Sequence, residues 1–318
     1  MKELRVGTRG SKLAIAQTNI VLESLSRVNP VFEYEIVKIV TSGDLDKQQA
    51  LFSMDRKGLF EKEINEAVLN DEVDVAIHSI KDVPSTLNEN LTISSIPRRE
   101  SINDVLISKR KRKLIDLPSN SVIGTSSLRR AIQLINLRKD LIVKPIRGNI
   151  DTRIAKTLKG DYDGIILAEA GLKRMGKLDV ISQRLEITKF LPAPGQGALG
   201  IVSKKNNKTL IKFLKKIEDE PSRKSIEVER TFISKIEGGC RFPIGACAIA
   251  SKRNNSIRFF SKIFSSDGSE QLIVKKIGSY DSPKRLGNIA AKYLLRNGAA
   301  RFAQGWDKAV DEWNKKNY

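Results

Sequence analysis

The thiol of Cys240 stands in a segment whose backbone is poorly suited to a regular element. Two glycines precede it and Pro243 follows shortly after. Glycine admits positive φ and proline fixes its own φ, so such a turn exposes its side chains. This makes Cys240 a candidate for holding a ligand. The alternative is a buried cysteine acting as a small apolar residue, and Cys247, inside the apolar run 244–250, fits that alternative well.

Basic residues recur at the ends of strand-like runs, beside glycine, serine or threonine. Clear examples are residues 8–11, 78–82, 124–130 and 146–149. Helix N-termini attract anions and disfavour cations by about a few tenths of a kcal/mol. Arg129 and Arg130 in a first helical turn therefore predict an anion on Ser126 and Ser127, although pairing with local acids is the alternative. Guanidinium forks suit carboxylates and no Walker-type loop is present, which favours a ligand with several carboxylates over a nucleotide.

Asp82 is an acid within this cationic set, directly after Lys81. Surrounded by arginines it is expected to stay ionised, which suits stabilising a developing cation and moving protons. A salt-bridge partner or a turn cap is an equally good interpretation of this residue alone. His78 lies within a strand-like run, so we expect a core or supporting residue rather than a catalyst.

These residues are set between alternating strand-like and helix-like segments. Strands are expected at residues 3–8, 35–40 and 74–80, with helices from Lys12 and around 60–68. The rhythm restarts after about residue 103, with strands at 121–124, 141–146 and 164–168 and helices at 127–138 and 150–158. It predicts mostly parallel sheets with helices on both faces. Residues 191–198 are rich in Pro and Gly and predict a hinge or a crossing segment. No internal repeat is strong enough to assert.

A third unit is expected from about residue 221. It contains a helix over 223–236, the Cys240 turn, strands around 246–250, 257–265 and 271–277, and a helix from about 282. At 318 residues the chain has room for two or three domains. No apolar stretch approaches the ~18 residues of a membrane span. The N-terminal residues lack a signal-peptide core, two cysteines make no disulfide framework, and no metal-ligand spacing is present, so a reducing cytoplasm is expected.

The net charge of +20 admits nucleic acid, a polyanionic small substrate or a lysine-rich surface as its explanation. The run 109–113 is the best candidate for nucleic-acid binding or a localisation signal, but a surface loop is the favoured interpretation. Aromatic residues make up only 6% of the chain and are absent from the basic runs, which argues against nucleic-acid stacking.

Seven segments together resemble the porphobilinogen deaminase (hydroxymethylbilane synthase) family of tetrapyrrole biosynthesis. They occur in the family's order and spacing over about residues 4–300: VGTRGSKLA (6–14), HSIKDVP (78–84), IGTSSLRR (123–130), IRGNIDTR (146–153), AGLKR (170–174), PGQGA (194–198) and GGC (238–240). Any one of them is weak evidence, whereas seven in order are highly specific. Residues 55–60 depart from the family's usual Gly-Gly-Lys-Gly-Leu-Phe, and the tail 305–318 has no counterpart, so it is either an added docking helix or a frayed end.

The resemblance implies an α/β fold of three domains. The first two, residues 1–97 plus about 198–217 and residues 98–197, would resemble a two-lobed type II periplasmic binding protein. The third, residues 218–318, would be a small α/β domain with an antiparallel sheet that carries Cys240. A monomer is expected.

The resemblance also implies the chemistry. Cys240 would carry a dipyrromethane cofactor through a thioether. Four porphobilinogen units would be added, each losing ammonia to give an azafulvene-type cation, and hydrolysis would release 1-hydroxymethylbilane. Asp82 would be catalytic; Lys81, Ser127, Arg129 and Arg130 would bind the cofactor; and the substrate and growing polypyrrole chain would be bound by Arg9, Ser11, Gln17, Arg147, Arg153, Arg174 and Gln196. A two-lobed binding protein without chemistry is the alternative, but it would need neither Cys240 nor Asp82.

Overall fold

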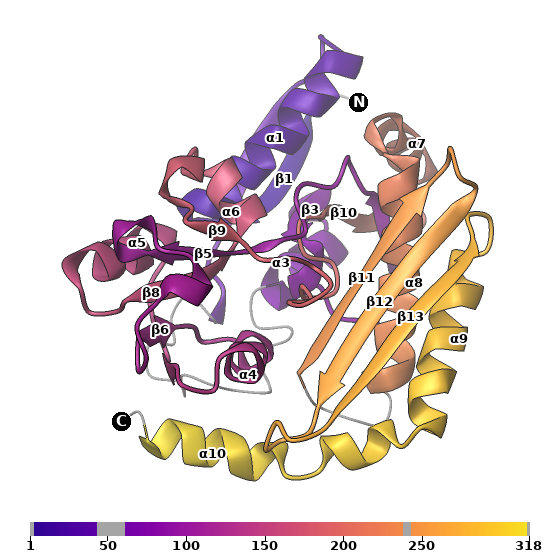
Figure 1. Cartoon of the computed structure of the whole chain (residues 1–318). Helices are drawn as coiled ribbons and strands as arrows, with labels where there is room; N and C mark the ends of the chain where they lie inside the picture. Colours follow the sequence, from indigo (N-terminus) through magenta and orange to yellow (C-terminus); the bar gives the residue numbers. More distant parts are fainter. Residues whose placement is uncertain (1–2, 43–60, 238–242, 317–318) are drawn as a thin grey trace.

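The computed structural model describes residues 3–42, 61–237 and 243–316. Its strands form three sheets: two of five strands, with the orders β2-β1-β3-β10-β4 and β7-β6-β8-β5-β9, and one of three strands, with the order β11-β12-β13. Figure 1 shows the three-stranded sheet beside the two others. The elements expected from the sequence are present, and the chain is α/β as predicted.

The first sheet has helices packed on both of its faces. Its strands are β1 (Leu4–Arg9), β2 (Tyr34–Ile39), β3 (Val75–Ser79), β4 (Leu91–Ser95) and β10 (Leu199–Lys204), and its helices are α1 (Lys12–Val28), α3 (Lys62–Leu69) and α7 (Lys208–Leu214). Val21 of α1 is buried with Val6 on one face, while Ile64 of α3 is buried with Ala76 on the other. The period of 3.6 in the apolar residues of both helices produces these buried stripes.

The second sheet repeats the connectivity of the first. Its strands are β5 (Asp104–Ser108), β6 (Val122–Gly124), β7 (Ile142–Lys144), β8 (Gly164–Ala168) and β9 (Gln183–Arg184), with helices α4 (Leu128–Leu137), α5 (Ile150–Lys159) and α6 (Glu169–Arg174). β1 and β6 each pair in parallel with both neighbours, and β10 and β5 each pair antiparallel with both of theirs. In each sheet four of the five strands therefore run in the same direction, and one strand, β10 or β5, runs opposite to them. This confirms the expectation of mostly parallel sheets, although the single antiparallel strand in each was not predicted.

The antiparallel strands follow the two places where the chain passes from one sheet to the other. The crossing segments, residues 96–103 and 191–198, lead into β5 and β10. They contact each other, since the Glu100 amide donates to the Gly197 carbonyl at 3.2 Å and Arg99 Nε donates to the Gln196 carbonyl at 2.8 Å. A Cβ on Gly197 would lie 2.5 Å from the Glu100 carbonyl oxygen, so this close approach needs glycine.

The third sheet is antiparallel and carries two helices on one face (Figure 1). Its elements are β11 (Ile244–Ser251), β12 (Ser256–Phe264), β13 (Gln271–Ser279), α8 (Glu220–Glu237) and α9 (Pro283–Arg296). Phe232 of α8 packs on Phe259 of β12 with ring centroids 4.9 Å apart. Short 3₁₀ turns complete the described chain: η1 (Ile80–Asp82), η2 (Lys109–Lys111), η3 (Leu114–Asp116), η4 (Leu178–Val180), η5 (Lys215–Ile217) and η6 (Ala299–Ala303).

The tail forms a helix, α10 (Trp306–Lys316), which packs against other parts of the same chain. Trp306 is buried in the core of the third sheet, while Val310 is buried with Leu128 and Ala131 of α4 in the second. The basic run 109–113 is exposed throughout and begins with the 3₁₀ turn η2. Within the described ranges no helix is long and apolar enough to cross a membrane.

Candidate active site

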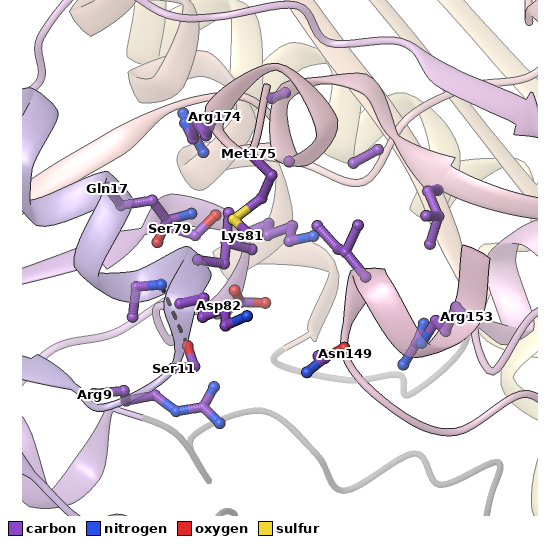
Figure 2. A pocket seen from close by; sticks show the side chains of 18 of the residues that line it. Arg9, Ser11, Gln17, Ser79, Lys81, Asp82, Asn149, Arg153, Arg174 and Met175 are labelled. Carbon is purple, nitrogen blue, oxygen red and sulfur yellow. Dashed lines mark hydrogen bonds between the residues drawn. The ribbon is translucent and has the colours of Figure 1, made fainter. Parts of the chain in front are cut away.

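A cavity of about 860 Å³ lies where strand ends of the two five-stranded sheets face each other. Ligands of open α/β sheets bind beyond the carboxyl ends of their strands, and residues after β1, β3, β6, β7 and β8 line this cavity. Figure 2 shows Asp82 near its centre, between Arg9 and Ser11 on one side and Asn149 and Arg153 on the other. Ten of the expected site residues line it: Arg9, Ser11, Gln17, Lys81, Asp82, Arg130, Arg147, Arg153, Arg174 and Gln196.

Positive charge predominates in the lining. Among its described residues, seven are lysines or arginines and three are acids, namely Glu61, Asp82 and Asp151. The cations come from both sheets, so a ligand with several carboxylates would contact both at once. The arrangement can bind a polycarboxylate around one central acid.

The 3₁₀ turn η1 carries Lys81 and Asp82 from the end of β3 into the cavity. Ile80 fixes the turn, because its side chain is buried and its amide donates to the Ala198 carbonyl at 3.0 Å. Burial lowers the pKa of the Lys81 ammonium, with Asp82 opposing that shift and Arg130 adding to it. The Asp82 side chain is exposed at the cavity. An acid next to a partly desolvated ammonium is suited to proton transfer.

On the first sheet, the start of α1 offers helix amides to the cavity. Ser11 caps α1 by accepting the Ala14 amide at 3.2 Å, and the first turn contains no acid. Gln17, one turn further along α1, is buried and also lines the cavity. A carboxylate placed here would meet the positive end of the helix dipole together with Arg9.

On the second sheet, the turns after β6 and β7 are joined by hydrogen bonds and together form one wall of the cavity. The Ser126 hydroxyl donates to the Ile146 carbonyl at 2.7 Å and accepts the Ile146 amide at 3.1 Å, which ties the end of β6 to the segment carrying Arg147. Arg153 Nε donates to the Gly148 carbonyl at 2.7 Å. Asn149 caps α5 by accepting the Thr152 amide at 2.9 Å.

Arg174 closes the wall near the crossing segments. Its guanidinium donates to the Gly197 carbonyl at 2.7 Å, and burial lowers its pKa to about 10. Met175 follows it at the end of α6 and points into the cavity in Figure 2. Sequence reasoning did not single out Met175.

Arg129 and Arg130 bind a buried carboxylate that sequence reasoning missed. Asp104, the first residue of β5, is fully buried; its Oδ2 lies 2.8 Å from an Arg129 nitrogen and its Oδ1 accepts Arg130 Nε at 3.0 Å. Burial alone would raise the pKa of Asp104, but the two arginines hold it below its ordinary value. Gln196 Nε2 donates to the same Oδ1 at 3.0 Å. The signal in the sequence was an acid opening the apolar run 105–107.

This pairing changes the interpretation of the first turn of α4. Only Arg130 reaches the cavity, whereas Ser127 and Arg129 are not among its lining residues. Arg129 also donates to the Leu191 carbonyl of a crossing segment at 2.5 Å. The unfavourable charge at this helix start is therefore compensated inside the protein, by an acid distant in sequence.

His78 and Cys247 are both buried, as expected, although His78 also lines the cavity. His78 is buried, with Nε2 3.0 Å from Asn65 Oδ1, and burial lowers its pKa to about 4. Cys247 is fully buried in β11, and burial raises its pKa to about 12. Cys240 and residues 55–60 lie outside the described residues.

The repeated mixed sheets, the two crossing segments and the cation-lined cavity define a two-lobed α/β protein with a third domain attached. The family model "Porphobilinogen deaminase, dipyromethane cofactor binding domain" matches residues 4–212, and "Porphobilinogen deaminase, C-terminal domain" matches residues 224–296. The chain belongs to the porphobilinogen deaminase family.

Curated relatives match over nearly their whole length. The chain is 48% identical to a probable porphobilinogen deaminase of Nitrosopumilus maritimus (strain SCM1), over 98% of each protein. It is 44% identical to the porphobilinogen deaminase of Geobacillus sp. (strain WCH70), over 99% of this chain and 100% of the relative. It is 42% identical to that of Bacillus subtilis (strain 168), again over 99% and 100%.

Proposed function

We propose that this chain is a hydroxymethylbilane synthase whose active site is the cavity around Asp82. As a transferase it joins four porphobilinogen molecules, with loss of ammonia from each, and releases 1-hydroxymethylbilane by hydrolysis. The observation that carries the proposal is one acid at the centre of a lining dominated by cations from both sheets. Porphobilinogen bears an acetate and a propionate, so both it and its oligomers are polycarboxylates that need such a lining.

The cavity fits the dipyrromethane cofactor that the family requires. Its four carboxylates match a lining that includes Arg130, Lys81 and the N-terminus of α1. Cys240 would hold it through a thioether, and α8 ends at Glu237, three residues before that thiol. When bound, the cofactor supplies the pyrrole carbon to which the first substrate is joined.

Each lining residue has a role that follows from its place. Asp82 stabilises the positive charge that develops on a pyrrole nitrogen as ammonia leaves, and it takes up and returns the proton that the new carbon–carbon bond displaces. Lys81 and Arg130 hold cofactor carboxylates. The substrate and chain carboxylates are held by residues from both sheets: Arg9, Ser11, Gln17, Arg147, Arg153 and Arg174.

Ser127, Arg129 and Gln196 support these residues. Arg129 and Gln196 bind Asp104, which keeps Arg130 directed at the cavity. Ser127 is the N-cap of α4, and its amide donates to Thr125 Oγ1 at 3.2 Å.

The domain boundaries proposed are residues 1–97 with 198–217, residues 98–197, and residues 218–318. Their support is that β10 pairs in the first sheet although it follows the second crossing segment, while β5 opens the second sheet directly after the first. A monomer is also proposed, as the family resemblance implies. A reducing cytoplasm would keep the Cys240 thiol free for the thioether.

The first experiment is the intact mass of the denatured protein and of Cys240→Ser. We expect the wild type to carry one additional dipyrromethane unit and Cys240→Ser to carry none. An unmodified wild type, produced with a porphobilinogen supply, would contradict the proposed function.

Asp82→Asn tests the central acid. The variant is expected to fold and to retain the mass increment, while its kcat falls by about 10²- to 10⁴-fold, the usual worth of a positioned acid–base group. Asp116→Asn, at an exposed acid of η3 outside the cavity lining, is the control. Normal turnover in Asp82→Asn would remove Asp82 from its role.

A further inference from the structure

Arg230 of α8 binds the segment that directly follows Asp82. Its Nη2 donates to the Pro84 carbonyl at 2.7 Å and to the Ser85 carbonyl at 3.1 Å, and its Nη1 donates to the Val83 carbonyl at 3.4 Å. Within the described residues the guanidinium makes no ion pair with a carboxylate. Among these residues, the side chain of Arg230 in the third domain therefore hydrogen-bonds to backbone carbonyls of the first domain.

The guanidinium of Arg230 is partly buried and has no acid beside it among the described residues. Burial, with a smaller contribution from the neighbouring Arg223, lowers the pKa of Arg230 to about 10. Desolvating a charge costs free energy unless hydrogen bonds compensate it. Hydrogen bonds to three successive carbonyls provide that compensation. The planar guanidinium of an arginine, with its several donors, is suited to bridging them.

The carbonyls of the bridged segment depend on Arg230, whereas its first residue is also held by a buried Val83 side chain and by the Val83 amide, which donates to the Ile80 carbonyl at 3.2 Å. Among backbone hydrogen bonds of the described residues, none ends on the carbonyls of Val83, Pro84 or Ser85. Pro84 has no N–H to donate. On the far side of Asp82, the Ile80 amide is bonded to Ala198. The turn bearing Asp82 is thus held by a crossing segment on one side and by Arg230 on the other.

The base of Arg230 is itself fixed. The adjacent Glu229 is fully buried and accepts Arg99, the Gly195 amide and the Ala248 amide at 2.6–3.0 Å. The same helix ends at Glu237, three residues before Cys240 in the sequence. The contacts of Glu229 therefore fix the part of α8 from which Arg230 reaches the segment after Asp82.

We propose that Arg230 is a positioning residue: by binding the carbonyls of residues 83–85 from α8, it sets the place of Asp82 in the cavity. The inference rests on the proposed function, which gives Asp82 its role. Arg230 does not line the cavity, so its loss affects the geometry of the reaction and not the binding of carboxylates.

The test compares Arg230→Met, Arg230→Lys and the control Lys235→Met, which removes the same charge from an exposed site on the same helix. For Arg230→Met we expect the cofactor mass increment to persist, KM for porphobilinogen to stay within about twofold, and kcat to fall by about 10- to 100-fold, the effect of a small misplacement. Arg230→Lys keeps the charge but not the fork, so its kcat should lie between those of wild type and Arg230→Met.

Hydrogen exchange supplies a readout that does not depend on turnover. Peptides covering residues 82–88 should exchange faster in Arg230→Met than in wild type or Lys235→Met. Unchanged exchange, a kcat within twofold of wild type, or a raised KM at constant kcat would each overturn the proposal. Should Arg230→Met fail to fold, the same criteria apply to Arg230→Lys. A wild type without the mass increment would instead refute the proposed function, and the exchange result would still decide whether Arg230 holds the turn.

Discussion

His78 is the single histidine of the chain, and its buried imidazole makes a pH dependence of stability traceable to one group. Burial lowers its pKa to about 4, against an ordinary value of 6.5. Between pH 4 and 6.5 the imidazole of His78 is therefore protonated in the unfolded chain but neutral in the native protein. Stability from this residue is therefore complete above pH 6.5 and is lost as the pH falls towards 4.

We expect His78→Gln, which keeps a polar partner for Asn65, to remove this dependence. Unfolding by urea, measured at steps from pH 7.5 to 4, should show wild type losing about 2–3 kcal/mol more than the variant over the window. Parallel curves for the two proteins would show that His78 already titrates normally in the native state.

Asp104 is the second single residue expected to have a large effect on stability, because its buried carboxylate forms ion pairs with both Arg129 and Arg130. Asp104→Asn would leave two buried guanidiniums without a counter-charge, which is expected to cost about 3–5 kcal/mol. Urea unfolding measures the loss, with Asp140→Asn, at a partly exposed ion pair with Arg138, as a control expected to lose far less. Equal stability of Asp104→Asn and wild type would mean that Arg129 and Arg130 find compensation elsewhere.

At the scale of elements, the crossing segment 191–198 determines the place of the η1 turn. Gly195 has φ of +78°, and a Cβ there would lie 2.6 Å from the Ile80 side chain and 2.8 Å from the Lys81 amide. Because Lys81 and Asp82 share that turn, Gly195→Ala should displace both. We expect a loss of about 1–3 kcal/mol from backbone strain, together with reduced kcat.

Gly176→Ala separates strain from displacement. Gly176 also has positive φ, +67°, but a Cβ at this position would meet nothing within 4 Å. The variant should lose comparable stability in urea unfolding yet keep its kcat. Equal losses of kcat in both variants would argue that the contact of Gly195 with the η1 turn is unimportant.

Local patterns predicted most elements and, through the Gly, Ser and Arg residues of strand-to-helix turns, the segments that carry six of the cavity residues. The other four were expected only from the family resemblance: Gln17, Arg153, Arg174 and Gln196. Local patterns could not predict what depends on distant partners. The strands β5 and β10 pair with strands more than 50 residues away in the sequence. The two five-stranded sheets repeat a topology without a recognisable sequence repeat, and Asp104 meets Arg130 only in the folded chain.

At the scale of the whole molecule, the proposed function requires the three sheets to keep their relative positions while the product chain lengthens in the cavity. Arg99, Glu229 and Arg230 join the third domain to the crossing segments and to the Asp82 turn. The tail adds a second connection, away from these contacts (Figure 1). There α10 passes from the core of the third sheet, through Trp306, to α4 of the second, through Val310.

The connection through α10 can be broken without removing the helix. Val310→Ser leaves Trp306 buried but replaces the side chain that packs on Leu128 and Ala131, so we expect a loss of about 2 kcal/mol from lost apolar burial. Since α4 carries Arg130 from its first turn, loosening this contact should also lower kcat modestly. Calorimetry of wild type, Val310→Ser and the control Lys308→Ser, on the exposed face of α10, measures the effect. A broadened or split transition in Val310→Ser alone is the expected sign that the second and third domains unfold less cooperatively. Identical transitions in all three proteins would mean that α10 rests on α4 without stabilising it.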